Sequence, residues 1–390
     1  MNDRLAVDMP NETHMQLRKA RRVTKGVAAY MLDVGQGDST IVLLPGEPVR
    51  VVVFDCADDH VLRTILDDWQ VQVIEAFVLS HLDQDHIAGA LAFLQAFSGE
   101  VRHVYLSPDR DVSGEHEEAK RAKALLDHVA EQSQDEGARK RRWELHPNTR
   151  DHRAIVEGSG WSIRLLAPPH AQVVTREREG TWEEANRYSS IMRIEAGGNA
   201  MLVGGDAPLL SWSKLPAEDR PAKVFRTPHH GGAIDDGGVP PGWDVARLYR
   251  EVGAETALVS VGTNNSYGHP DRTWIHPLTG GACRLMCTQL TARCHRSLDI
   301  VQPDGAVVRD ADEISELRAR VITQHHQWIV PQYRHLTDKR RAVRSGQLEV
   351  PCAGTVVVTL HLDGRVDVLP APGGGHDVVV DGWEQPLCRA

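Results

Sequence analysis

The stretch Val78–Ala90, VLSHLDQDHIAGA, constrains the fold of this chain more than any other feature. It places two imidazoles and two carboxylates directly after an apolar run and directly before apolar residues at helical spacing. His81 and Asp83 are two residues apart, so in an extended segment their side chains lie on one side and can grip one ion. Asp85 and His86 follow where a helix begins and can turn toward a second ion. The stretch therefore predicts a metal site at the end of a strand.

Strand-like and helix-like patterns alternate along the chain on both sides of this stretch. The strand-like runs are at 27–34, 40–45, 49–56, 73–80, 101–108, 161–168, 223–228 and 256–262, with a hairpin over 189–206. The helix-like stretches are at 60–70, 86–97 and 115–132. Motifs rich in polar residues lie at the strand ends. This is typical of a layered α/β fold whose functional residues are on the loops.

Composition narrows the class of protein without identifying a function. The 390 residues are 41% hydrophobic and 25% charged, as expected for a globular chain with one large domain and a small one, or with two of medium size. No apolar run approaches the roughly 18 residues of a membrane span, and no secretory signal is visible, so we expect a cytoplasmic protein. The net charge of −10 does not favour coating of nucleic acid by bulk electrostatics. It leaves open a site that handles phosphates, because a carboxylate cluster is locally electropositive once it holds cations.

Further candidate ligands follow later strand-like runs. They are Asp206 in LVGGDA, His229 and His230 in TPHHGG, and His269 in NNSYGHP. Glycines flank each of them, as close backbone packing around a site requires. Consecutive residues of an extended strand point to opposite faces, so we expect only one of His229 and His230 to meet a given ion. A rigid turn is the alternative interpretation of the GHP segment.

Six motifs occur in an order that resembles the metallo-β-lactamase-fold hydrolases. They are MLDVGQGDST, VLSHLDQDHIAGA, NRYSSIMRI, MLVGGDA, TPHHGG and VSVGTNNSYGHP, which together extend over about residues 27–295. Within that superfamily they resemble the soluble hydrolase domain of the ComEC DNA-uptake protein. The resemblance implies an αββα sandwich with a dinuclear site along one edge. Most of the superfamily has His where this chain has Asp83, and a carboxylate there makes Mn²⁺ as plausible as Zn²⁺.

The resemblance also implies roles for the residues of these motifs. His81 and Asp83 match the ligands of one metal, Asp85 and His86 those of the second, and Asp206 the bridging carboxylate.

Of the histidine pair, one matches a ligand and the other faces substrate phosphate, and we favour His230 as the ligand over His229. His269 and Tyr267 match residues beside the site that bind substrate or protonate a leaving group. Asp55 matches an acidic residue that orients a ligand histidine.

Other matched residues have roles that the resemblance leaves less defined: Gln36, Asp38, Asn186 and Ser189. Four histidines match no motif and are expected to be structural or exposed: His60, His103, His152 and His170.

The domain organisation expected from these patterns has three parts. Residues 1–24 form a flexible N-terminus, 25–295 the hydrolase-like domain, and 296–390 a helical segment followed by a small β-rich C-terminal appendage. Within that last part, 313–336 is helix-like, 350–370 predicts a hairpin with Asp363-Gly364 at its turn, and 376–383 predicts another strand.

The cysteines near and within the C-terminal part allow two interpretations. Cys287, Cys294, Cys352 and Cys388 could hold a structural zinc ion that ties the chain end to the main domain. They lack the C-x₂-C spacing of zinc ribbons, so buried thiols are the alternative.

The motifs favour a metal-dependent hydrolase of phosphodiesters, with DNA as the first substrate to consider and catalysis assigned to Asp85, His269 and Tyr267. A second interpretation is a hydrolase of small substrates, such as a cyclic nucleotide, a phosphocholine-type ester or a lactone. A third is a metal-binding scaffold that has lost activity. A basic groove beside the metals would favour nucleic acid as the substrate, and a closed apolar pocket would favour a small molecule.

Overall fold

The computed structural model describes residues 25–107, 117–134, 144–147, 154–168, 185–235, 237–262, 267–279, 283–289 and 352–370, with the short pieces 265, 291, 300–301, 307–308, 376 and 388. The N-terminal 24 residues, the helix-like stretch 313–336, most of the strand expected over 376–383, and Cys294 lie outside the described residues.

The first sheet contains eight strands in the order β17-β16-β1-β2-β3-β4-β5-β6. Neighbouring strands from β3 to β6 are parallel, whereas the strands on the β1 side pair antiparallel. The bounds are β1 Gly26–Met31, β2 Ser39–Leu43, β3 Arg50–Cys56, β4 Val73–Leu79, β5 Glu100–Leu106, β6 Glu144–Pro147, β16 Val356–His361 and β17 Val366–Leu369.

The second sheet contains seven strands in the order β13-β12-β11-β10-β9-β8-β7. Its strands from β10 to β13 are parallel neighbours. The bounds are β7 Val156–Gly158, β8 Trp161–Ala167, β9 Ile191–Ala196, β10 Asn199–Val203, β11 Val224–Arg226, β12 Thr256–Val259 and β13 Arg284–Cys287, and a separate pair consists of β14 Ile300–Val301 and β15 Val307–Val308.

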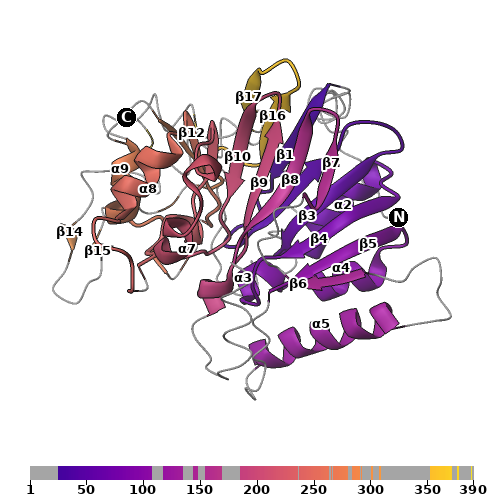
Figure 1. The fold of residues 1–390 in the computed structure, drawn as a ribbon. Helices are drawn as coiled ribbons and strands as arrows, with labels where there is room; N and C mark the ends of the chain where they lie inside the picture. Colours follow the sequence, from indigo (N-terminus) through magenta and orange to yellow (C-terminus); the bar gives the residue numbers. More distant parts are fainter. Residues whose placement is uncertain are drawn as a thin grey trace, which may run out of the picture.

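The helices lie outside the two sheets (Figure 1). Those on the first sheet's side are α2 Asp59–Asp68, α3 Gln84–Ile87, α4 Ala90–Ala96 and α5 Glu117–Gln134; those on the second sheet's side are α7 Leu209–Ser213, α8 Val245–Val252 and α9 Arg272–Thr279. Three short 3₁₀ turns are η1 Ala185–Tyr188, η2 Ala217–Asp219 and η3 His229–Gly231. Across the described segments, none of the helices combines the length and the apolar character that a membrane span requires.

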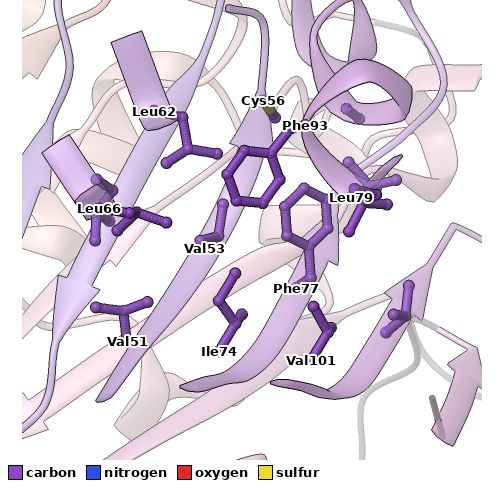
Figure 2. Packing of buried hydrophobic residues seen from close by; sticks show 14 of the residues in the cluster. Val51, Val53, Cys56, Leu62, Leu66, Ile74, Phe77, Leu79, Phe93 and Val101 are labelled. Carbon is purple, nitrogen blue, oxygen red and sulfur yellow. The ribbon is translucent and has the colours of Figure 1, made fainter. Parts of the chain in front are cut away.

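Side-chain alternation along β3 explains how the layers are held together. Val51 and Val53 point toward the helices, where they share a core with Leu62 and Phe93 (Figure 2). Their neighbour Val52 points the other way and belongs to a second core between the two sheets. A strand that is buried on both faces reads as a continuous apolar run, which the sequence of β3 shows.

A third core packs the other helices against the second sheet, through residues such as Trp212 on α7 and Leu248 on α8. The molecule therefore has four layers, with helices, two sheets and helices in succession. This arrangement confirms the αββα sandwich that the motifs predict.

The described part of the C-terminal region is integrated into this sandwich. The predicted hairpin is present, with β16 and β17 paired antiparallel and the turn at Asp363-Gly364. β16 in turn pairs with β1 along its whole length, from Gly26 opposite His361 to Met31 opposite Val356. The hairpin thus extends the first sheet rather than standing apart from it (Figure 1).

Candidate metal centre

The polar motifs converge where the carboxyl ends of parallel strands from both sheets meet. Asp55 lies near the end of β3, and His81 follows β4 in the first sheet. Asp206 follows β10, and the His229-His230 pair follows β11 in the second sheet. Strands that run in parallel present their carboxyl ends at one edge, which is where open α/β sheets generally place their binding sites.

Four buried side chains can surround a single ion at this edge. Asp38, His86, Asp206 and His230 each offer one ligand atom, and these atoms all lie within 4.8 Å of one another. His86 Nε2 is 3.1 Å from Asp206 Oδ1, and His230 Nε2 is 4.0 Å from the same oxygen. Asp85 approaches from the edge of this group, with its Oδ2 3.1 Å from His230 Nε2.

Asp206 lies between this group and a second one. Its Oδ2 is 3.7 Å from His81 Nε2, and the same nitrogen is 3.5 Å from Asp83 Oδ2. One oxygen of Asp206 therefore faces His86 while the other faces His81. This is the position that a carboxylate bridging two ions must occupy.

The buried donor atoms of the centre are suited to binding a metal ion. Within the described residues, His81 Nε2, His86 Nε2 and Asp206 Oδ1 are buried and make no well-formed hydrogen bond to a group outside the centre itself. Buried polar atoms are nearly always paired in folded proteins, so this concentration of unsatisfied nitrogen and carboxylate oxygen calls for a cation. Imidazole with carboxylate is a donor set that suits zinc, and added carboxylates favour manganese.

The ring orientation of His86 is fixed by Asp55 and Ser80. Asp55 is fully buried in a left-handed backbone conformation, with φ of 60°. Its carboxylate accepts hydrogen bonds from Ser80 N at 2.7 Å, from Ser80 Oγ at 2.8 Å and from His86 Nδ1 at 2.8 Å. Because Nδ1 donates to Asp55, Nε2 is the nitrogen of His86 that faces Asp206 and that a cation could take in place of a proton.

The two adjacent histidines approach the centre from the second sheet. His230 Nδ1 donates to the carbonyl of Ser260 at 2.9 Å, so its Nε2 is the nitrogen that faces the centre, 3.1 Å from Asp85 Oδ2. His229 Nδ1 likewise donates to the carbonyl of Ala233 at 2.5 Å, and its Nε2 is 3.8 Å from Asp206 Oδ2. His230 is buried, whereas 29% of the His229 side chain is exposed.

The expectation that only one histidine of the pair meets a given ion stays a prediction, although its premise about the backbone is wrong. It assumed that the strand stays extended through both residues and turns only at Gly231-Gly232. Instead the turn η3 begins at His229, and both His229 and His230 have φ of 53°. The two rings therefore reach opposite oxygens of Asp206.

Opposite charges stabilise the ionised carboxylates of the centre. Burial raises the pKa of Asp206, but the nearby His86, His230 and His81 outweigh it and hold that pKa well below its usual range. Burial lowers the pKa of His86, but Asp206 and Asp55 outweigh it and raise that pKa well above its ordinary value. Burial raises the pKa of Asp85, but the hydrogen bond from His230 and the charge of His86 lower it overall. The charged groups of the centre thus compensate one another.

Arg226 is a component of the site that sequence reasoning missed. It is the last residue of β11 and is buried, with Nη2 against Asp38 Oδ1 and Nη1 donating to Thr40 Oγ1 at 3.2 Å. The signal for it is a charged residue closing the short apolar run VFR. Arg226 holds Asp38 among the potential ligands, whereas the motif resemblance left the role of that carboxylate undefined.

The other matched residues hold the loops together. Ser189 Oγ accepts a hydrogen bond from Asp206 N at 2.9 Å and lies 3.4 Å from His81 Nδ1. The carbonyl of Asn186 accepts from Ser189 N at 3.0 Å. Gln36 Oε1 accepts from Gly262 N at 3.2 Å, which joins the loops that follow β1 and β12.

Tyr267 and His269 form a ledge beside the centre. Their rings lie 5.8 Å apart and within 11° of parallel, and the His269 ring is 5.3 Å from that of His229. Burial, together with the nearby His229 and His230, lowers the pKa of His269 to about 4. Tyr267 is 71% exposed. The ledge therefore presents a neutral imidazole and an accessible aromatic face.

The structure tests the structural-zinc interpretation of the cysteines only in part, because Cys294 lies outside the described residues. Cys287 and Cys352 lie on adjacent backbones, since Ala353 N donates to Cys287 O and Cys352 N to Thr288 O, both at 2.8 Å. Cys388 packs against the core that contains Cys287. In the part of the chain that the structure describes, these three cysteines do not complete a group of three metal-ligating atoms. The structural zinc stays a prediction.

The two-sheet fold and the order of motifs around this centre make the chain similar to metallo-β-lactamase-fold hydrolases. Among curated proteins it is similar to ComE operon protein 3 of Bacillus subtilis (strain 168), with 22% identity over 278 residues. That match covers 66% of this chain and 31% of the relative, so the chain spans about a third of the relative's length. No family model matches the sequence.

The chain also matches solved structures. A diphosphatase from the PhnP family is 14% identical, with 66% of this chain and 94% of that one covered and a TM-score of 0.35. Human tRNase Z, short form, is 13% identical, with 59% of this chain and 91% of that one covered and a TM-score of 0.33.

Proposed function

We propose that the chain is a metal-dependent phosphodiesterase that cleaves nucleic acid, with DNA as its first candidate substrate. The observation that supports this most is the position of Asp206 between two sets of imidazole and carboxylate donors. A single structural ion would need only one such set. Two sets around one carboxylate are the arrangement that hydrolases of phosphate esters use.

The residues that would hold the ions divide into two groups. His81 and Asp83 would hold one ion, and His86, His230 and Asp85 the other, with Asp206 shared and Asp38 beside the second. When bound, two divalent cations supply an activated water and neutralise the charge that builds on the phosphate. Zn²⁺ and Mn²⁺ are the ions that this donor set favours.

The remaining residues position these groups and the substrate. Asp55 keeps His86 in the tautomer that exposes Nε2, as Ser260 does for His230. Tyr267 and His269 would contact the substrate next to the scissile phosphate, with the exposed Tyr267 ring available for stacking on a base. DNA is placed first among substrates because the motifs resemble those of a domain of a DNA-uptake protein.

The test is hydrolysis by the purified full chain on defined substrates. Single-stranded DNA, double-stranded DNA, single-stranded RNA, a cyclic nucleotide and a lactone would be incubated with the chain after removal of metal and after addition of Mn²⁺ or Zn²⁺. We expect cleavage of nucleic acid only with added metal. Asp206→Asn should abolish it, whereas Asp67→Asn, on the exposed face of α2, should not. Hydrolysis of the lactone or cyclic nucleotide alone would refute the nuclease and favour the small-substrate alternative.

A further inference from the structure

A second group of ligand-type side chains lies away from the metal centre, where β6 forms the edge of the first sheet. In the parallel pair β5–β6, His103 is opposite Glu144 and Tyr105 is opposite His146. The two residues on each strand are two positions apart, so all four side chains are on one face of the sheet. It is the face toward the second sheet, because the β4 partner of Tyr105 is Val78, which belongs to the core between the sheets.

The distances within this group match the coordination shell of a small ion. His103 Nδ1 is 3.1 Å from His146 Nε2 and 3.3 Å from Glu144 Oε2, and His146 Nε2 is 3.7 Å from the same oxygen. Ligand atoms at about 2.0–2.1 Å from a tetrahedral zinc ion are separated by about 3.3 Å. The three distances between ligand atoms in this group, 3.1, 3.3 and 3.7 Å, lie around that value.

Hydrogen bonding within the triangle can serve only one of its contacts at His103 at a time. His103 Nδ1 is within reach of both His146 Nε2 and Glu144 Oε2. The single proton on this nitrogen can be directed at only one of them. A cation at the centre of the triangle would satisfy all three atoms at once.

The rings are held in place and are accessible. Tyr105 stacks on His146 with ring centroids 4.8 Å apart and planes within 20°. The side chains of His103 and His146 are 31% and 35% exposed, and that of Glu144 is 67% exposed. An ion could therefore enter from solvent without opening the core, and the two rings would meet it with restricted motion.

We propose that His103, Glu144 and His146 bind one divalent cation of the zinc class at a site separate from the metal centre. Two imidazoles with one carboxylate suit Zn²⁺ better than Mg²⁺ or Ca²⁺. Three protein ligands leave a fourth position for water, which makes the ion exchangeable. Its ligands come from neighbouring strands, so the ion links edge strand β6 to β5. None of these residues belongs to the hydrolytic centre, and the proposal stands whether or not the chain cleaves nucleic acid.

The experiment is a titration of the metal-free full chain with zinc chloride, followed by calorimetry, for the wild type and for E144Q, H103Q and H146Q. Losing an outer partner of a metal ligand commonly weakens binding 10- to 100-fold, so losing a ligand should weaken one binding event at least about a hundredfold. The other binding events should keep their wild-type affinities. E144Q is the main variant, because its exposed side chain makes a folding defect the least expected.

The matched control is H361Q. His361 is also a strand histidine of the first sheet, with Nε2 2.8 Å from Asp367 Oδ2, but it is outside the groups of three potential ligands found in the described residues. H361Q should bind zinc as the wild type does. Wild-type zinc stoichiometry and affinity in E144Q and H146Q would overturn the proposal, as would equal weakening in H361Q.

Discussion

Replacement of Arg226 by methionine tests whether the buried charges of the metal centre form one balanced network. Arg226 is 1% exposed and Asp38 is 2% exposed, and their side chains are in direct contact. Removing one partner of a buried ion pair typically costs about 3–5 kcal/mol, since it leaves the other charge buried and uncompensated. Methionine retains most of the side-chain volume, so the cost of a cavity is small. We expect the metal-free R226M variant to lose about 3–5 kcal/mol of unfolding free energy.

The measurement is urea unfolding of the metal-free chain, with D38N and the double variant completing a cycle. If the loss comes from an uncompensated carboxylate, D38N should cost less in the R226M background than in the wild type, with a coupling above about 1 kcal/mol. K123M is the control, because Lys123 forms an exposed pair with Asp127 on α5 and should cost under about 0.5 kcal/mol. A loss below about 1 kcal/mol in R226M, or additive costs in the cycle, would refute the reasoning.

Four further variants separate the roles of individual residues in the centre. D85A should abolish hydrolysis and keep the wild-type melting curve, since Asp85 is at the rim and contacts His230; near-normal turnover would remove the two-metal mechanism. H230A should lower metal content and activity together, whereas H229A should keep most of the metal and change KM or kcat. Metal analysis and kinetics of both variants test this, and the reverse pattern would swap the roles of the two histidines. G232A should reduce activity at unchanged metal content, because a Cβ there would lie 2.1 Å from the His269 ring; unchanged kinetics would mean that His269 does not act at the site.

Much of the fold is predictable from the sequence because local patterns determine it. The strand-like runs over 49–56 and 73–80 become β3 and β4, and their apolar character reflects burial on both faces. The hairpin over 350–370 is equally local, since its turn residues mark it. The docking of that hairpin on β1 is not local, because a strand edge gives no sequence signal for its partner.

The centre shows the same division between local and long-range information. The metal-ligating residues of Val78–Ala90 can be recognised in the sequence by their type and spacing. The structure brings two of them, His81 and His86, together with ring centroids 4.1 Å apart. The β5–β6 group gives no such signal. His103 and His146 become neighbours only through the register of two strands, and each is an isolated histidine in the sequence.

The turn at the histidine pair is also a long-range effect. Residues other than glycine seldom adopt positive φ, and two in succession need outside support. Here the His229 amide donates to the carbonyl of Gly205, at 2.9 Å, in the loop that carries Asp206. The ring of His230 is fixed by Ser260 at the end of a different strand. The backbone strain is therefore sustained by contacts with both neighbouring loops, and it brings two imidazoles to one carboxylate where an extended strand would bring one.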